Sequence, residues 1–162
     1  MIYNIPSTTN HPIDAKLAER LREIEGIVAM KYTTNDLSSF LSLLRVLKDR
    51  IPVFIGAEAL IYSALSIGAA GAVVGISNAI PKQTVQIYRL YESGDFTAAR
   101  SAQMSILPLV DVMFVGTFPA ALKAALEELN HNVGPVRKPL MPLTNLERID
   151  IKKALQAMGL VH

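Results

Sequence analysis

Cysteine and tryptophan are absent from the 162-residue chain, and histidine occurs only three times. Without cysteine the chain has no disulfide and no thiolate metal site. His11, His131 and His162 are far apart and lack the spacing of metal ligands. The glycines of residues 68–75 lie inside a strand-like segment, which differs from the strand-turn-helix order of a dinucleotide-binding motif. We therefore expect no metal and no cofactor.

Charge and long apolar runs are also scarce. The formal net charge is +2, and no cluster of Lys and Arg is interleaved with aromatic residues, which argues against nucleic-acid binding. The longest apolar stretch, residues 63–80, is broken by glycines and Ser77, so we expect no membrane span. The first residues lack a basic region followed by an apolar core, which is the mark of a signal peptide. These features predict a cytoplasmic protein.

Short apolar segments alternate with amphipathic ones up to Gly94. Strands are expected in residues 1–6, 27–30, 51–56 and 70–75, and helices in residues 12–26, 34–50, 57–68 and 81–94. The strands are apolar throughout, which predicts a parallel sheet with both faces buried. After Gly94 the pattern is helical, over residues 95–114, 119–130 and 145–160, with Pro108 kinking or dividing the first.

These elements predict an α/β fold made of four βα units, residues 1–94, followed by a C-terminal helical region, residues 95–162. An open sheet of four buried-type strands would leave two unpaired edges. A TIM (β/α)8 barrel needs roughly 250 residues. Because Met1 lies almost on the first strand, we interpret the chain as the second half of such a barrel.

Lys31 closes the apolar run of residues 27–30, at the end of a predicted strand. In a barrel that end faces the mouth where active sites lie. Partial removal from water disfavours a charged ammonium, and a neutral amine attacks carbonyl carbons to give a Schiff base. Tyr3 ends the preceding strand, where a phenol is able to move protons near an imine. Each residue alone has an ordinary reading: a strand-end lysine that reaches solvent, and an aromatic residue at the barrel mouth.

The segments "YNIPSTTNHPI" and "IVAMK" together resemble the paired signature of the dihydrodipicolinate synthase / N-acetylneuraminate lyase family of class I, pyruvate-dependent aldolases. Tyr3, Pro6 and Thr9 match the first motif, and Lys31 matches its Schiff-base lysine at the right distance. Further likeness lies in "FIGAEAL", "GAAGAVVGISNAIP", "FVGTFPAALKAAL" and "VGPVRKPLMPLT". The resemblance covers nearly the whole chain, but only the second half of the family's fold.

The resemblance implies a carbon-carbon lyase that joins pyruvate to an aldehyde, or cleaves the product, without a metal. Lys31 is implied to form the pyruvate Schiff base and Tyr3 to be the proton shuttle. Gly56 and Val73 are implied to line the pocket through main-chain groups. Glu58 either contacts substrate hydroxyls or is a first-turn helix acid favoured by the helix dipole.

Two departures from the family pattern bear on the substrate. The dihydrodipicolinate synthase branch has a carboxylate-binding arginine where this chain has Thr8, and threonine cannot form that two-pronged contact. Thr8 and Thr9 therefore favour a hydroxylated acceptor, such as the aldehyde of a 2-keto-3-deoxy sugar acid, over aspartate semialdehyde and a role in lysine biosynthesis. The family's Gly-Thr-Thr-Gly-Glu-type pyruvate-carboxylate loop belongs to the first half of the fold, which this sequence does not contain.

Three hypotheses follow from the half-barrel. The chain is an aldolase that acts with a complementary half, which is either the rest of a longer chain or a second polypeptide. Alternatively, it forms a homo-oligomer that closes a pseudo-barrel. The third hypothesis is a catalytically incomplete module that binds a partner through its sheet edges.

Overall fold

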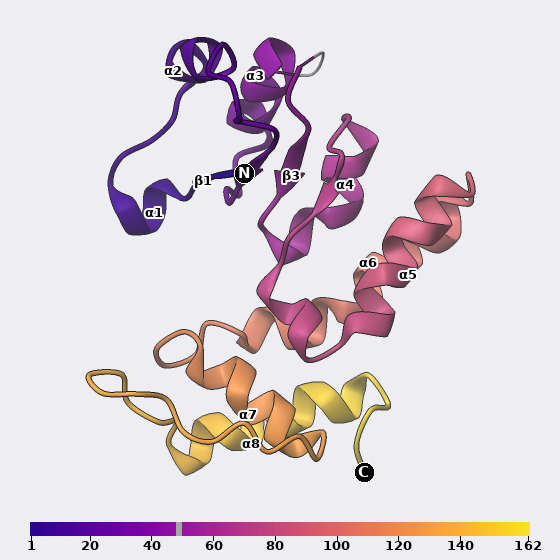
Figure 1. Ribbon diagram of the computed structural model, residues 1–162. Helices are drawn as coiled ribbons and strands as arrows, with labels where there is room; N and C mark the ends of the chain where they lie inside the picture. The colour runs from indigo at the N-terminus through magenta and orange to yellow at the C-terminus, as the bar shows by residue number, and fades with distance from the viewer. Residues whose placement is uncertain (48–49) are drawn as a thin grey trace. The chain divides into compact units, whose positions relative to one another are not determined.

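Four short parallel strands form the sheet that carries the candidate site (Figure 1). They are β1 (Ile2–Asn4), β2 (Met30–Tyr32), β3 (Val53–Ile55) and β4 (Gly71–Ala72), in the spatial order β1-β2-β3-β4. Tyr3 pairs in register with Lys31, and Lys31 with Phe54. The order follows the sequence, so a crossover connects each of the first three strands to the next one, as consecutive βα units require. The predicted parallel sheet is confirmed.

The computed structural model describes residues 1–47 and 50–162, which fall into two compact units, residues 1–74 and 75–162. The first unit holds the sheet with α1 (Pro6–Thr9), α2 (Ala15–Leu21), α3 (Leu37–Leu47), the 3-10 helix η1 (Glu58–Leu60) and α4 (Ile61–Ser66). Asp36 caps α3, because its Oδ1 accepts hydrogen bonds from the backbone N–H groups of Ser38 and Ser39. The last residues of the predicted helix 34–50 include Lys48 and Asp49, which lie outside the described residues.

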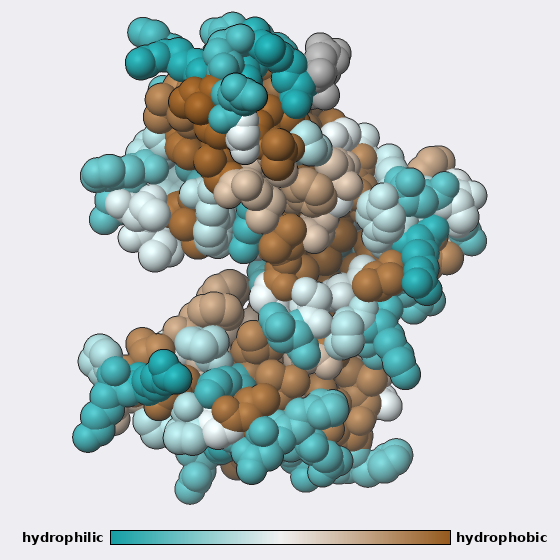
Figure 2. All heavy atoms as spheres, in the orientation of Figure 1, coloured by the Kyte–Doolittle hydropathy of each residue, from teal (hydrophilic) through white to brown (hydrophobic). Residues whose placement is uncertain are grey.

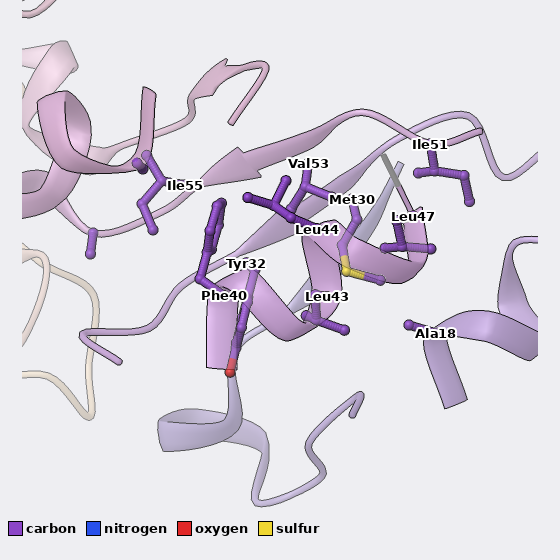
Figure 3. Packing of buried hydrophobic residues seen from close by; sticks show 12 residues of the cluster. Ala18, Met30, Tyr32, Phe40, Leu43, Leu44, Leu47, Ile51, Val53 and Ile55 are labelled. Atoms are coloured by element: carbon purple, nitrogen blue, oxygen red, sulfur yellow. The ribbon is translucent and has the colours of Figure 1, made fainter. Parts of the chain in front are cut away.

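The core of this unit lies between the strands and α3 (Figure 3). Met30 and Tyr32, two residues apart on β2, both point toward α3, and the Tyr32 ring stacks on Phe40 with centroids 6.0 Å apart. Burial of side chains of this size contributes about 1.5–3 kcal/mol each. The other buried side chains of the cluster include Leu43, Leu47, Val53 and Ile55.

The prediction that the strands are buried on both faces is wrong. Side chains alternate between the two faces of a strand, and the buried ones are those that face α3. On the other face Tyr3 is 47% exposed and Val73 is 38% exposed. The strand predicted at residues 27–30 also begins later, at Met30, so that Lys31 lies inside β2, and Val28 before it is exposed.

The second unit is helical. It contains the 3-10 helix η2 (Gly75–Asn78), α5 (Pro81–Glu92), α6 (Phe96–Val112), α7 (Ala120–Glu128) and α8 (Asn145–Ala157). Pro108 lies within α6, which is one helix. The compact units divide after Val74, whereas the predicted boundary after Gly94 follows the βα repeat and stays a prediction. No helix among the described residues is long and apolar enough to cross a membrane.

Candidate active site

Lys31 and Tyr3 lie side by side in the middle of β2 and β1, each one residue before the carboxyl end of its strand. Their Cα atoms are register partners, so both side chains leave the same face of the sheet. The Nζ atom of Lys31 lies 4.1 Å from the centroid of the Tyr3 ring. A cation–π contact of this kind contributes about 0.5–1 kcal/mol at an exposed site. It keeps the amine beside the phenol.

Thr33 completes a row of three polar groups and is a site residue that was not predicted from the sequence. Its Oγ1 lies 3.1 Å from the hydroxyl of Tyr3. Its backbone N–H donates to the carbonyl of Asn4 at 2.9 Å, which extends the pairing of β2 with β1 beyond the strand ends. Thr33 is two residues after Lys31, so the period of two that governs side chains in strands predicts it on the same face. That signal was available in the sequence.

Gly56 lies directly against Lys31 and Thr33. A Cβ atom built on Gly56 would be 1.9 Å from Oγ1 of Thr33 and 2.9 Å from Cε of Lys31. Its backbone N–H donates to the carbonyl of Tyr32 at 2.8 Å, so the backbone is fixed at that position. No side chain larger than hydrogen fits there without displacing the lysine or the threonine.

Val73 and Glu58 follow the last two strands. The N–H of Val73 donates to the carbonyl of Ile55 at 2.8 Å, so the β3–β4 pairing continues to this residue. Glu58 begins η1 shortly after β3 and is 8% exposed. A carboxylate at that depth needs polar neighbours. A pocket-lining role for Val73 and the two alternative roles of Glu58 stay predictions.

Thr8 and Thr9 lie on α1, in the loop that follows β1. Both are exposed, and neither hydroxyl bonds to Lys31 or Tyr3. The hydroxyl of Thr9 donates to the carbonyl of Ile5 at 3.1 Å and accepts from the N–H of His11 at 3.3 Å, so it is engaged within the loop. Among the described residues, the hydroxyl of Thr8 has no hydrogen-bond partner.

The structure thus brings three of the predicted residues into contact range: Lys31, Tyr3 and Gly56. With Thr33 they place an amine, a phenol and an alcohol hydroxyl in sequence on one sheet face. An amine is able to attack a carbonyl carbon, and a phenol with a hydrogen-bonded partner is able to donate and recover a proton.

The model of the dihydrodipicolinate synthetase family matches residues 1–158. The 4-hydroxy-tetrahydrodipicolinate synthase of Clostridium perfringens (strain 13 / Type A) is 32% identical over 161 residues, which are 99% of this chain and 55% of the relative. The match to the same enzyme of Sorangium cellulosum is 32% identical over 159 residues, 98% of this chain and 53% of the relative. The chain therefore spans about half the length of these relatives.

A solved structure shows the same correspondence. The dihydrodipicolinate synthase of Thermotoga maritima matches with a TM-score of 0.93 at 26% identity, over 98% of this chain and 55% of that one. The match thus places the described strands and helices on part of a larger fold, as the sequence predicts.

Proposed function

Because the chain belongs to the dihydrodipicolinate synthetase family, we propose that it carries the lysine side of a class I, pyruvate-dependent aldolase site. The single observation that carries this proposal is the contact between Lys31 and Tyr3, the two residues that match the family's signature, with Nζ 4.1 Å from the ring centroid. They are register partners, each one residue before the carboxyl end of its strand, which is close to where barrel active sites lie.

The reaction begins when the neutral amine of Lys31 attacks the keto carbon of pyruvate. The carbinolamine takes up a proton on its hydroxyl and loses water, which leaves an iminium ion linked to Nζ. The iminium withdraws electrons from the adjacent methyl group, which loses a proton to give an enamine. The enamine carbon then attacks the aldehyde carbon of the acceptor, whose oxygen takes a proton. Hydrolysis of the new imine frees the product and Lys31.

Tyr3 is proposed as the group that moves these protons. Its hydroxyl is bonded to Oγ1 of Thr33 at 3.1 Å, which fixes the direction of the phenol and offers a partner for its proton. Proton transfer by a positioned side chain contributes typically about 10²–10⁴-fold in rate. Gly56 supports this arrangement, because its lack of a side chain leaves space for Cε of Lys31.

The acceptor is proposed to be a hydroxylated aldehyde. Thr8 stands where the dihydrodipicolinate synthase branch has its carboxylate-binding arginine, and its exposed hydroxyl is able to pair with an acceptor hydroxyl but not to form a fork with a carboxylate. The alternative acceptor is aspartate semialdehyde, which the names of the relatives favour. Pyruvate is common to both readings.

A complementary half-barrel is the proposed partner. β1 and β4 each pair on one side only among the described residues, and unpaired edges bind further strands. On the sheet face opposite α3, Tyr3 is 47% exposed and Val73 is 38% exposed, and Figure 2 shows hydrophobic surface between hydrophilic patches. The half is either the rest of a longer chain or a separate polypeptide. A second copy of this chain, and a non-catalytic binding module, are the alternatives.

Borohydride trapping tests the proposal. The chain is incubated with pyruvate, reduced and digested, and the modified lysine is identified by mass spectrometry. The expected adduct is on Lys31 and is absent from the Lys31→Arg variant. The same assay is repeated with the part of the Clostridium perfringens relative that the match leaves uncovered. If folded protein gives no adduct on Lys31, either alone or with the complementary part, the aldolase proposal is rejected and the non-catalytic binding module is the alternative that stays.

A further inference from the structure

The side chain of Asn4 makes a two-point bridge to a residue nine positions later. Asn4 is the last residue of β1 and is 1% exposed. Its Nδ2 donates to the carbonyl of Ile13 at 2.9 Å, and its Oδ1 accepts from the N–H of Ile13 at 3.0 Å. Both hydrogen-bonding groups of the amide are therefore used on one backbone position. A buried amide left with unmade bonds would cost about 1–3 kcal/mol, so this bridge is well determined.

The bridge closes the segment of residues 5–13, which carries Thr8. Within the described residues, the other hydrogen bonds of this segment are internal. The N–H groups of Thr8 and Thr9 donate to the carbonyl of Ile5, and that of Asn10 donates to the carbonyl of Pro6. Internal bonds shape α1 but do not attach it to the sheet. Its polar attachment comes from Asn4 at its downstream end.

The backbone of Asn4, which substitution of its side chain leaves in place, also contacts a residue of the candidate site. Its backbone carbonyl accepts from the N–H of Thr33 at 2.9 Å, and Oγ1 of Thr33 is bonded to the hydroxyl of Tyr3. One residue thus joins the loop that carries Thr8 to the strands that carry the amine and the phenol.

We propose that Asn4 is a positioning residue that fixes residues 5–13, and with them the hydroxyl of Thr8, for contact with the acceptor aldehyde. This inference rests on the proposed function and assigns Asn4 no contact with substrate. It predicts that loss of the bridge weakens use of the acceptor while the reaction of Lys31 with pyruvate is kept. Asn4 differs in this from Tyr3, whose loss slows imine formation itself.

Hydrogen exchange measures the attachment directly. In Asn4→Ala, amides of residues 5–13 are expected to exchange about tenfold faster or more, with exchange in β2 and β3 unchanged. Asn4→Asp replaces the donor by a carboxylate oxygen that faces the carbonyl of Ile13 at a buried position, and is expected to loosen the same segment at least as much as Asn4→Ala. Asn35→Ala, which removes an exposed amide after β2, is the matched control and should leave residues 5–13 unchanged.

Acceptor use is measured in one turnover with the same variants. Pyruvate and D-glyceraldehyde are added together, and reduction traps either a pyruvate adduct or the heavier aldol adduct on Lys31. The complementary half is added if wild type requires it. In Asn4→Ala the rate at which the pyruvate adduct forms should then stay within about twofold of the wild-type rate. The D-glyceraldehyde concentration at which half of the pyruvate adduct becomes aldol adduct should rise about fivefold or more, because an unattached loop binds its ligand less well.

The outcomes separate the two proposals. If wild type forms no pyruvate adduct, either alone or with the complementary half, the aldolase proposal is rejected, and the role of Asn4 in acceptor binding with it. A wild-type adduct, together with unchanged exchange in residues 5–13 or an unchanged aldehyde dependence in Asn4→Ala, would reject only the inference about Asn4. Faster exchange throughout β2 and β3 in both Asn4 variants would also reject it, since Asn4 would then hold the fold rather than the loop.

Discussion

The backbone of Gly56 lies so close to Lys31 that a Cβ atom on the glycine would be 2.9 Å from Cε of the lysine. The same atom would be 1.9 Å from Oγ1 of Thr33, the partner of the Tyr3 hydroxyl. Glycine at this position therefore has a steric cause, which involves both the amine and the group that orients the phenol. The end of β3 forms one wall of the space in which the amine moves.

Gly56→Ala is expected to displace Lys31 and Thr33 with a modest loss of stability. Overpacking of this kind costs about 1–3 kcal/mol, and less where flexible side-chain ends yield. We expect trapping of pyruvate on Lys31 to fall about tenfold or more, because a small misplacement of reacting groups is costly. Trapping yield and urea unfolding measure the two effects separately. Ala59→Gly, at an exposed position in η1, is a control that should leave trapping intact. Wild-type trapping in Gly56→Ala would contradict the steric role.

Thr33→Val tests the hydrogen bond to Tyr3. Valine keeps the shape of threonine but removes the hydroxyl that lies 3.1 Å from that of Tyr3. We expect trapping by Lys31 to slow several-fold, and Tyr3→Phe to slow it by about 10²-fold or more. Because both changes act on one proton path, the double variant should be no slower than Tyr3→Phe. Ser42→Ala on α3 is the control. Independent, multiplied effects of the two substitutions would show that Thr33 does not act through Tyr3.

Much of this site was predictable because its determinants are local. The apolar run before Lys31 predicts a strand, and the pairing of Lys31 with Tyr3 agrees with two neighbouring parallel strands. The cap of α3 by Asp36 is local in the same way, because its Oδ1 accepts from N–H groups only two and three residues later. Thr33 was also within reach, since side chains alternate along a strand.

Other features depend on contacts that no local pattern encodes. The exposure of Tyr3 and Val73 reflects which face of the sheet α3 covers, and an apolar run cannot report that. The bridge from Asn4 to Ile13 joins residues whose proximity exists only once the loop is folded. The short helix α1 was missed because Thr8 and Thr9 are weak helix formers, and its bonds to Ile5 and Pro6 carry no sequence period.

The capping box of α8 makes the stability of the second unit dependent on pH. The N–H of Thr144 donates to Oε2 of Glu147 at 2.6 Å, and the Thr144 hydroxyl lies 2.8 Å from the same oxygen. The backbone N–H first, and the hydroxyl second, lower the pKa of Glu147 below its ordinary value of 4.5. Since the folded pKa is the lower one, this contribution is complete above pH 4.5 and is lost as the pH falls through the folded pKa.

Glu147→Gln removes that titration while it keeps an oxygen that accepts from Thr144. We expect urea unfolding between pH 7 and about pH 3 to show a smaller loss of stability in this variant than in wild type. Glu92→Gln, at an exposed position at the end of α5, is the control and should follow wild type. If the free energy of unfolding falls with pH as steeply in Glu147→Gln as in wild type, the capping box does not set the loss of stability in acid.

Lys123 holds the connection between α7 and α8 by donating three hydrogen bonds to consecutive carbonyls. Its Nζ lies 3.0 Å from the oxygens of Val133 and Gly134 and 2.9 Å from that of Pro135. An ammonium has three donors on one atom and suits this convergence, whereas the planar guanidinium of arginine spreads its donors. The lysine therefore takes the place of backbone N–H donors at three consecutive carbonyls of this proline-rich segment.

Lys123→Met keeps the apolar stem and removes the donors. Hydrogen bonds to charged groups contribute about 1.5–3 kcal/mol, and exposure of these carbonyls to water reduces the loss to the lower end. We expect faster hydrogen exchange in residues 131–143 and a lower urea midpoint, with Lys123→Arg only partly restoring both. Lys152→Met, an exposed lysine of α8, is the matched control. If the two methionine variants unfold alike, the three bonds add nothing beyond what water supplies. If only Lys123→Met loosens the segment, a single ammonium fixes the path of the chain between the two helices.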